Sequence, residues 1–394
     1  MANRVESKMT VSSSFPNVPL LDVRRQTAAI REETDAAIAR VLDHGQFILG
    51  PEVAMLEDQI AHYCGTRYAV ACASGSDALL LPLMALGIGP GDKVVTTPFT
   101  FFATAGSIAH VGATPVFVDI DPATFNIDPD ALARYLDNCA PADLRAVKAI
   151  IPVHLFGYCA DMTAINKIAS RYGIPVIEDA AQALGAEHGG VRAGGMGLCG
   201  TFSFFPSKNL GGFGDGGMIT TSDAALAEKL RLLRVHGSGA TYFHKYVGLN
   251  SRLDTLQAAI LLVKLKYLEE WTSGRRANAA VYEACLGQLP AAEIKLPAEH
   301  TSSRHIYNQY TVRVANRDAV RARLADTGVA SAIYYPLPLH QQECFAGLGY
   351  AAGDFPQSEA AAREVLSIPV EPGLSPELAA TVATRLIRAV HPDS

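Results

Sequence analysis

The sequence lacks the features that direct a chain to a membrane or to nucleic acid. Its longest apolar stretch covers residues 78–88, whereas a helix that spans a bilayer needs about 20 apolar residues. No run of lysine and arginine reaches five residues, and the formal net charge is −6. We therefore expect no nucleic-acid partner and no binding to an anionic membrane surface. Residues 1–15 also lack the apolar segment of a secretory signal, which predicts a cytoplasmic protein.

Cysteine is present without a pattern that would pair it. The count is odd and no CxxC pair occurs, so neither a disulfide framework nor a zinc site is expected. Reduced thiols fit this pattern better. The seven cysteines are Cys64, Cys72, Cys139, Cys159, Cys199, Cys285 and Cys344.

Length and composition indicate a large folded protein. The 394 residues are 49% hydrophobic and 18% charged, which is a composition able to bury a large core. At roughly 100–200 residues per domain, the length predicts two or three domains. We expect residues 1–15 to form a mobile tail, residues 16–270 a large cofactor-binding domain, and residues 271–394 a small C-terminal domain.

Short β-branched runs alternate with helical patterns between residues 68 and 221. Such alternation predicts an α/β fold with a mostly parallel sheet covered by helices, and the less regular remainder predicts a smaller α+β domain. The predicted strands are residues 68–72, 93–97, 114–120, 148–153, 174–180, 201–205, 216–221, 309–314 and 332–335. The predicted helices are residues 76–86, 103–110, 162–172, 223–235, 253–271, 317–326, 358–366 and 376–390.

Lys208 stands between an apolar strand and a loop with five glycines. A lysine in this place can be partly desolvated, which lowers its pKa and makes the amine nucleophilic. Glycines beside it let the backbone approach a bound ring or phosphate. The alternative is a surface lysine in a flexible loop. The five glycines are Gly211, Gly212, Gly214, Gly216 and Gly217.

Glu178 and Asp179 end an apolar strand within the segment PVIEDAAQALGA. A carboxylate at this place can pair with a pyridinium nitrogen and keep the nitrogen protonated, so that the ring withdraws electrons. Alternatively, Asp179 is the N-cap of a helix that starts at the following alanines. The two interpretations can also hold for different residues of the pair.

Two further segments join a strand to a helix. Ser74, Gly75 and Ser76 offer backbone N–H groups and a helix N-terminus to a phosphate, or simply cap the helix. Phe101 and Phe102 could stack on a planar ring, although core packing is the commoner role of a phenylalanine. Phosphate cap, stacking aromatic, strand-end carboxylate and lysine together satisfy the four needs of pyridoxal phosphate.

Nearly the whole chain resembles the DegT family of nucleotide-sugar aminotransferases, within the fold-type I pyridoxal-phosphate enzymes. The matching segments are HGQFILGPE, SGSDAL, GPGDKVVTTPFTFFAT, PVFVDID, IPVHLFG, PVIEDAAQALGA, FSFFPSKNLGGFGDGG and LNSRLDTLQAAIL. The resemblance implies transamination of a nucleotide-linked keto sugar, with glutamate as amino donor and a homodimer that shares its active sites.

The resemblance also implies a role for each matching residue. Lys208 forms a Schiff base with the cofactor and moves the proton, and Asp179 pairs with the ring nitrogen. Gln182 lies near the ring hydroxyl, and Phe101 stacks on the ring. The remaining implied cofactor contacts are Gly75, Ser76 and Ser203 on the phosphate, and Asn250 on the phosphate of the neighbouring subunit.

The expected substrate contacts are less sharply matched. Arg234, His236, Tyr335 and His340 lie in segments that contact the sugar nucleotide in relatives, but Tyr335 could instead be strand core and His340 an ordinary loop residue. Many relatives carry Thr in place of Ser76 and His in place of Gln182. We associate the Gln form with a 3-keto sugar, either UDP-linked or dTDP-linked, and a 4-keto sugar is the alternative.

Two other functions remain open from the sequence. An amino-acid-directed lyase or aldolase of the same fold would need a carboxylate-binding arginine in the small domain, for which Arg304 and Arg313 are candidates. A non-catalytic regulator could bind the cofactor as a sensor, usually with an added DNA-binding segment. The retained Lys208 argues against the related sugar 3-dehydratases, which carry His there.

Overall fold

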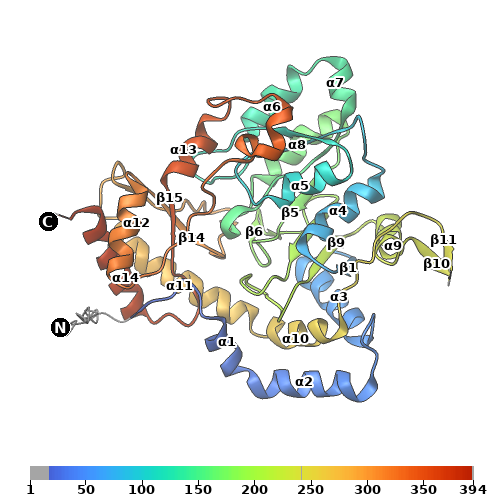
Figure 1. The fold of residues 1–394 in the computed structure, drawn as a ribbon, viewed down its shortest axis with the longest axis horizontal. Helices are drawn as coiled ribbons and strands as arrows, with labels where there is room; N and C mark the ends of the chain where they lie inside the picture. Colours follow the sequence, from blue (N-terminus) through green and yellow to red (C-terminus); the bar gives the residue numbers. More distant parts are fainter. Residues whose placement is uncertain (1–16, 241, 393–394) are drawn as a thin grey trace, which may run out of the picture.

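The structure is a computed structural model that describes residues 17–240 and 242–392. The tail expected for residues 1–15 lies outside this range. Figure 1 shows a broad sheet region at the centre and a smaller group of helices and strands beside it, near the C-terminus. No helix in the described ranges is both long and apolar enough to cross a membrane.

The central sheet carries the strands that the sequence predicts between residues 68 and 221. Strands β2 (Lys93–Thr96), β3 (Thr114–Phe117) and β4 (Val147–Ile150) run parallel, as do β5 (Ile177–Asp179) and β8 (Cys199–Ser203). Two parallel bridges, Ile150 to Val176 and Val153 to Asp179, join these groups. Strand β9 (Gly217–Thr221) is antiparallel to both β8 and β1 (Tyr68–Cys72). The order is therefore β3-β2-β4-β5-β8-β9-β1, which confirms the mixed, mostly parallel sheet.

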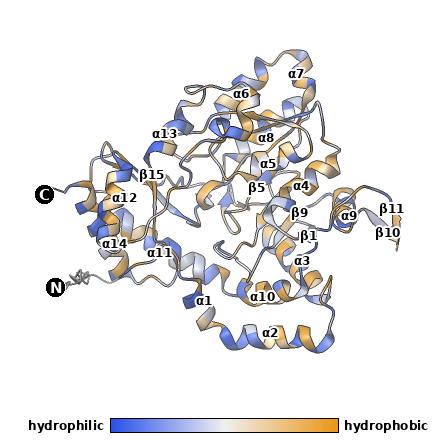
Figure 2. Cartoon of the chain, in the orientation of Figure 1, coloured by the Kyte–Doolittle hydropathy of each residue, from blue (hydrophilic) through white to orange (hydrophobic). Residues whose placement is uncertain are grey.

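Helices cover this sheet because its strands are apolar on both faces. Val70, Val94 and Ile177 are each fully buried, as parallel, two-sided sheets require. In Figure 2 the surrounding helices carry both hydrophilic and hydrophobic residues, as helices with one buried face do. These helices are α4 (Gly75–Leu86), α5 (Ala103–His110), α6 (Pro129–Asp137), α7 (Pro141–Ala146), α8 (Met162–Tyr172) and α9 (Ala224–Leu233).

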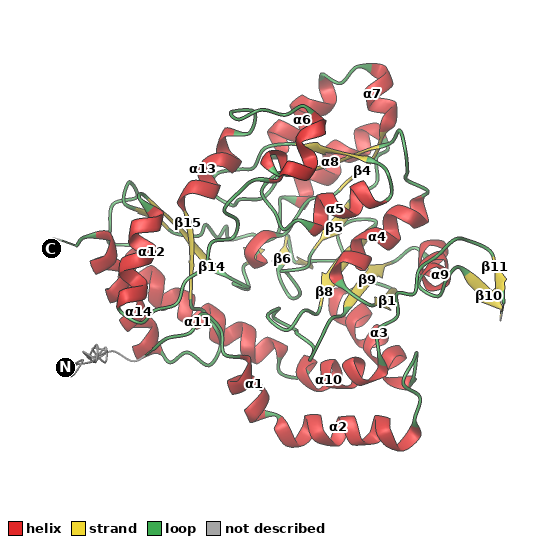
Figure 3. Ribbon diagram, in the orientation of Figure 1, coloured by secondary structure: helices red, strands yellow, loops and turns green. Residues whose placement is uncertain are grey.

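The N-terminal helices and the helix that leaves the sheet region pack side by side (Figure 3). They are α1 (Val23–Ala29), α2 (Arg31–His44), α3 (Pro51–Cys64), α10 (Thr255–Leu265) and α11 (Leu268–Leu286). The single helix predicted for residues 253–271 is wrong, since α10 ends at Leu265 and α11 begins at Leu268. Tyr267 between them stacks on Trp271 beside an apolar cluster that includes Val41 and Val263.

A second apolar core lies in the C-terminal part. Strands β12 (Ile294–Lys295), β14 (Tyr310–Val314) and β15 (Val365–Ile368) form an antiparallel sheet. Helices α12 (Arg317–Asp326), α13 (Pro356–Glu364) and α14 (Pro376–Val390) belong to this part. Its core also includes Val18, so residues near both ends of the described chain meet there.

Two predicted elements of this part are wrong in type. Residues 332–335 form no strand: only Ala332 bridges to Ser367, and the following tyrosines turn toward the candidate site. The helix predicted to reach residue 366 ends at Glu364, because Val365 and Leu366 pair with β14. Pairing with a neighbouring strand outweighs local helix preference in both directions.

Short elements complete the described chain. They are β6 (Glu187–His188), β7 (Val191–Arg192), β10 (Ser238–Ala240), β11 (Phe243–His244), β13 (Ser303–Arg304), and the 3₁₀ turns η1 (Leu155–Gly157), η2 (Leu339–Gln341) and η3 (Glu343–Leu348). Strands β10 and β11 form a hairpin that projects from the molecule in Figure 1.

Candidate active site

Asp179 is a buried carboxylate at the carboxyl end of β5. Its Oδ2 accepts a hydrogen bond of 2.7 Å from the Thr104 hydroxyl, and its Oδ1 accepts one of 3.2 Å from the backbone N–H of Ala181. Residues 180–186 form turns, so Asp179 caps no helix and the N-cap alternative is wrong. Burial raises the pKa of Asp179, while the Thr104 and Ala181 hydrogen bonds and the nearby Lys208 act against that rise.

Lys208 lies near Asp179, in the loop that follows β8. Burial lowers the pKa of its amine to about 8, although the charge of Asp179 opposes this change. An amine with this pKa has a far larger neutral fraction at physiological pH than an ordinary lysine, and the neutral form is the nucleophile. The surface-lysine alternative therefore does not describe Lys208.

Gln182 and Tyr335 form a second polar pair next to Asp179. The Oε1 of Gln182 accepts 2.7 Å from the backbone N–H of Phe156, so its Nε2 is directed to the Tyr335 hydroxyl at 3.1 Å. Burial raises the pKa of Tyr335, with a smaller contribution from the charge of Asp179. Phe101 is 58% exposed, and its ring centroid lies 6.2 Å from that of Tyr335. A planar ligand above Asp179 would therefore have an aromatic side chain available for stacking.

The N-terminus of α4 offers an anion cradle beside Ser203. Ser74 caps the helix by accepting 3.1 Å from the N–H of Asp77, and among the described residues no acceptor takes the N–H groups of Gly75 and Ser76. A Cβ at Gly75 would lie 2.6 Å from the Cβ of Ser203, so only glycine lets the two segments approach. Free N–H groups, the helix dipole and two hydroxyls suit a phosphate. The capping and phosphate interpretations thus apply to different atoms.

The glycines after Lys208 are needed for close approach rather than for unusual backbone angles. None of the five has a positive φ angle. A Cβ at Gly217 would lie 2.2 Å from the carbonyl oxygen of Ser74, and one at Gly212 would lie 2.8 Å from Oε1 of Gln257. These contacts hold the loop against the start of α4.

The four residues expected to contact substrate are not gathered in one place. Tyr335 lies beside Gln182, as described. Arg234 is buried, where its guanidinium pairs with Glu57 and donates 2.9 Å to the carbonyl of Ala71. His340 is also buried and contacts Oε1 of Glu359 at 3.2 Å. In this structure both side chains are engaged within the chain, so their contact with substrate stays a prediction.

His236 and Asn250 lie together on the segment after α9, and both are exposed. Val235 and Asn250 form a backbone bridge, and the neighbouring Ser251 donates 2.7 Å to Asp77 on the first turn of α4. The segment that carries Asn250 is therefore fixed near the anion cradle, while its side chain remains available to a ligand.

Sequence reasoning missed two groups that support the site. Thr104 and Thr100 contact Asp179 and each other, and the signal was a run of hydroxyl residues after β2. Glu178 was given no separate role, but its fully buried carboxylate accepts 2.7 Å bonds from the N–H groups of Gly194, Met196 and Gly197. It also contacts Nε2 of His154 at 3.0 Å. Glu178 thus anchors the loop beneath the site, and Asp179 is left for chemistry.

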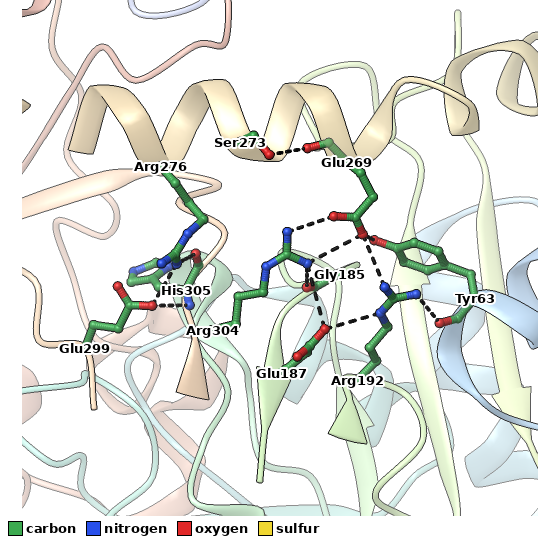
Figure 4. A network of polar contacts seen from close by, with 10 residues as sticks. All are labelled: Tyr63, Gly185, Glu187, Arg192, Glu269, Ser273, Arg276, Glu299, Arg304 and His305. Carbon is green, nitrogen blue, oxygen red and sulfur yellow. Dashed lines mark hydrogen bonds and ion pairs between the residues drawn. The ribbon is translucent and has the colours of Figure 1, made fainter. Parts of the chain in front are cut away.

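The two arginines that an amino-acid-directed enzyme would need are occupied. Arg304 donates 2.7 Å to Oε2 of Glu269 and lies within the network drawn in Figure 4, which also holds Arg192, Glu187 and Tyr63. Arg313 is buried and pairs with Glu364 at 2.7 Å. Neither guanidinium is free to bind a substrate carboxylate, which disfavours that alternative.

Comparison with known proteins agrees with the geometry. The profile of the DegT/DnrJ/EryC1/StrS aminotransferase family matches residues 28–387. A pleiotropic regulatory protein of Geobacillus stearothermophilus is 50% identical over 361 residues, which cover 92% of this chain and 95% of that protein. The UDP-2-acetamido-2-deoxy-3-oxo-D-glucuronate aminotransferase of Pseudomonas aeruginosa is 48% identical over 357 residues, covering 91% and 96%.

A solved structure extends the likeness to the fold. DesV of S. venezuelae, in complex with a ketimine intermediate, superposes with a TM-score of 0.91 at 42% identity. The match covers 95% of this chain and 99% of that one.

Proposed function

The chain belongs to the DegT/DnrJ/EryC1/StrS aminotransferase family, and we propose that it uses pyridoxal phosphate to aminate a nucleotide-linked 3-keto hexose with glutamate as donor. The observation that carries this proposal is the buried pair of Asp179 and Lys208, an acid and a low-pKa amine that influence each other's pKa. A sugar aminotransferase needs both groups around one cofactor ring.

The residues fit the cofactor at each of its reactive ends. Gly75, Ser76 and Ser203 can hold the phosphate, and Asp179 can hold the ring nitrogen. Gln182 can donate to the ring hydroxyl, since its Nε2 is the end directed into the site. When bound, the cofactor supplies an electron-withdrawing ring that stabilises negative charge on the carbon that loses a proton.

Lys208 has two tasks in this proposal. Its neutral amine attaches the cofactor, and after release it accepts and returns the proton that moves during the transfer. A lysine with a pKa near 8 is suited to both directions of proton transfer at neutral pH. Asp179 keeps the ring nitrogen protonated throughout.

A 3-keto nucleotide sugar is the substrate that the comparisons support best. The relative at 48% identity is named for a UDP-linked 3-oxo sugar, and the nucleotide could equally be dTDP. The name of the relative at 50% identity instead describes regulation. The complete set of catalytic side chains in this chain favours an enzyme, and turnover separates the two functions.

A homodimer with shared sites follows from the exposed apolar side chains around the cradle. Phe47, Ile48, Phe101, Phe205 and Phe213 are all at least 42% exposed. Apolar side chains grouped on loops at a site indicate a surface that another subunit covers. In that dimer, Asn250 of one subunit would reach the phosphate held by the other.

The direct test is glutamate-dependent amination of a panel of UDP- and dTDP-linked 3-keto and 4-keto sugars, followed by mass spectrometry. We expect 2-oxoglutarate and an amino sugar in equal amounts with a 3-keto substrate. A holoprotein that consumes glutamate but aminates only 4-keto sugars would correct the substrate, and one that aminates no sugar would contradict the proposal.

A further inference from the structure

Two buried threonines stand behind the carboxylate of Asp179. The Oγ1 of Thr104 lies 2.7 Å from Oδ2 of Asp179, 3.1 Å from Oγ1 of Thr100 and 3.2 Å from the carbonyl oxygen of Phe101. Thr104 is fully buried and Thr100 nearly so. Because water is excluded here, the hydroxyl protons must be placed among these few atoms.

Counting protons fixes the direction of the hydrogen bonds. A hydroxyl has one proton to donate, and an ionised carboxylate can only accept. The Thr104 proton therefore goes to Asp179, since that contact is the shortest and the acceptor is charged. Thr100 must then be the donor in its 3.1 Å contact with Thr104. The result is a one-way chain from Thr100 through Thr104 to Asp179, in which each bond strengthens the next.

We propose that Thr100 and Thr104 form a positioning relay that keeps Asp179 ionised and oriented in its buried site, so that the proton of an Asp179–ring-nitrogen pair stays on the nitrogen. This inference rests on the proposed function, because it concerns the bound cofactor ring. Thr104 acts through Asp179, and Thr100 acts through Thr104.

The other charged and titratable groups around Asp179 do not replace the relay. Burial is the largest influence and favours the neutral acid, and the Thr104 hydrogen bond is the largest influence against it. Lys208 contributes through its charge, but its ammonium form is lost when the amine attaches the cofactor. His154 contributes less, and its ring is bonded to Glu178. Tyr335 donates no hydrogen bond to Asp179 and is paired with Gln182.

Removing the Thr104 hydroxyl should therefore move a proton. Without that donor, the proton affinity of Asp179 rises and the pair shifts from carboxylate and protonated nitrogen toward neutral acid and neutral ring. In T104V we expect the rate of the glutamate half-reaction to fall about tenfold or more, as loss of a hydrogen bond to a charged group implies. The binding of glutamate should change little.

The ring nitrogen itself reports the effect without any turnover. Each holoprotein is prepared with cofactor labelled with ¹⁵N in the ring, and the nitrogen chemical shift is measured across the stable pH range. T104V should move toward the neutral-pyridine value, T104S should stay near wild type because it keeps the hydroxyl, and T100V should move less than T104V in the same direction.

Thr96→Val is the matched control, because Thr96 is also buried but donates 2.8 Å to the carbonyl of Ile151, away from Asp179. It should leave the nitrogen shift unchanged, and thermal unfolding of each apoprotein checks the fold. A wild-type nitrogen signal in a folded T104V holoprotein would overturn the relay. A wild-type protein that binds no cofactor would instead contradict the proposed function.

Discussion

The cofactor side and the substrate side of the site differ in how much one chain provides. On the cofactor side, Asp179, Gln182 and Glu178 are buried, and each is held by backbone or hydroxyl donors. On the substrate side, Phe101, His236 and Asn250 are exposed and lie on loops. The protein thus prepares the chemistry within each chain. We infer that recognition of the sugar depends on surfaces that a ligand or second subunit completes.

Substitution of Lys208 should give the largest effect. Lys208→Ala removes the amine that attaches the cofactor and moves the proton, so sugar amination should fall below detection while the protein remains folded. Product formation by mass spectrometry and thermal unfolding provide the two readouts. Substantial remaining turnover would move the essential amine away from this residue.

Asp179→Asn should leave a protein that retains cofactor but reacts slowly. The amide cannot keep the ring nitrogen protonated, so we expect the half-reaction with glutamate to slow by about 100-fold, within the range of lost acid–base assistance. Stopped-flow absorbance measures the rate, and dialysis measures retention. A rate close to wild type would show that the strand-end acid is structural.

Cofactor loading should depend on pH through the amine of Lys208. Because burial lowers the pKa of that amine to about 8, the neutral fraction rises about tenfold per pH unit below 8 and levels off above it. The rate at which apoprotein gains the cofactor absorbance should follow this curve. A rate that keeps rising to pH 10 would indicate an ordinary, solvated lysine.

Asn250→Ala should have the smallest effect, a loss of several-fold in cofactor affinity. If Asn250 acts across a dimer, mixing this variant with Lys208→Ala should yield some mixed dimers with one intact site, and activity should reappear. Activity that stays at the level of the separate variants would place Asn250 in its own subunit's site.

The chemistry at strand ends could be predicted from the sequence because it depends on short, local patterns. Apolar runs ending in Asp179 or followed by Lys208 mark the carboxyl edge of a sheet, where ligands bind. Arg234 could not be placed in this way, since its partner Glu57 is 177 residues away in the chain. The relay from Thr100 was also hidden, because only side-chain geometry shows which hydroxyls face Asp179.

Elements whose type depends on distant partners were the least predictable. Val365 and Leu366 continue a helical pattern but become a strand because β14 lies beside them. Strand β9 reads like its parallel neighbours in the sequence, yet it runs antiparallel between β8 and β1. Local propensity is weak beside such pairing.

The most direct test of the account is to reduce the wild-type holoprotein with borohydride and locate the modified residue by peptide mass spectrometry. The account predicts a yellow protein with one phosphopyridoxyl group, carried by the peptide that contains Lys208. A protein that takes up no cofactor, or an adduct on a different lysine, would contradict it.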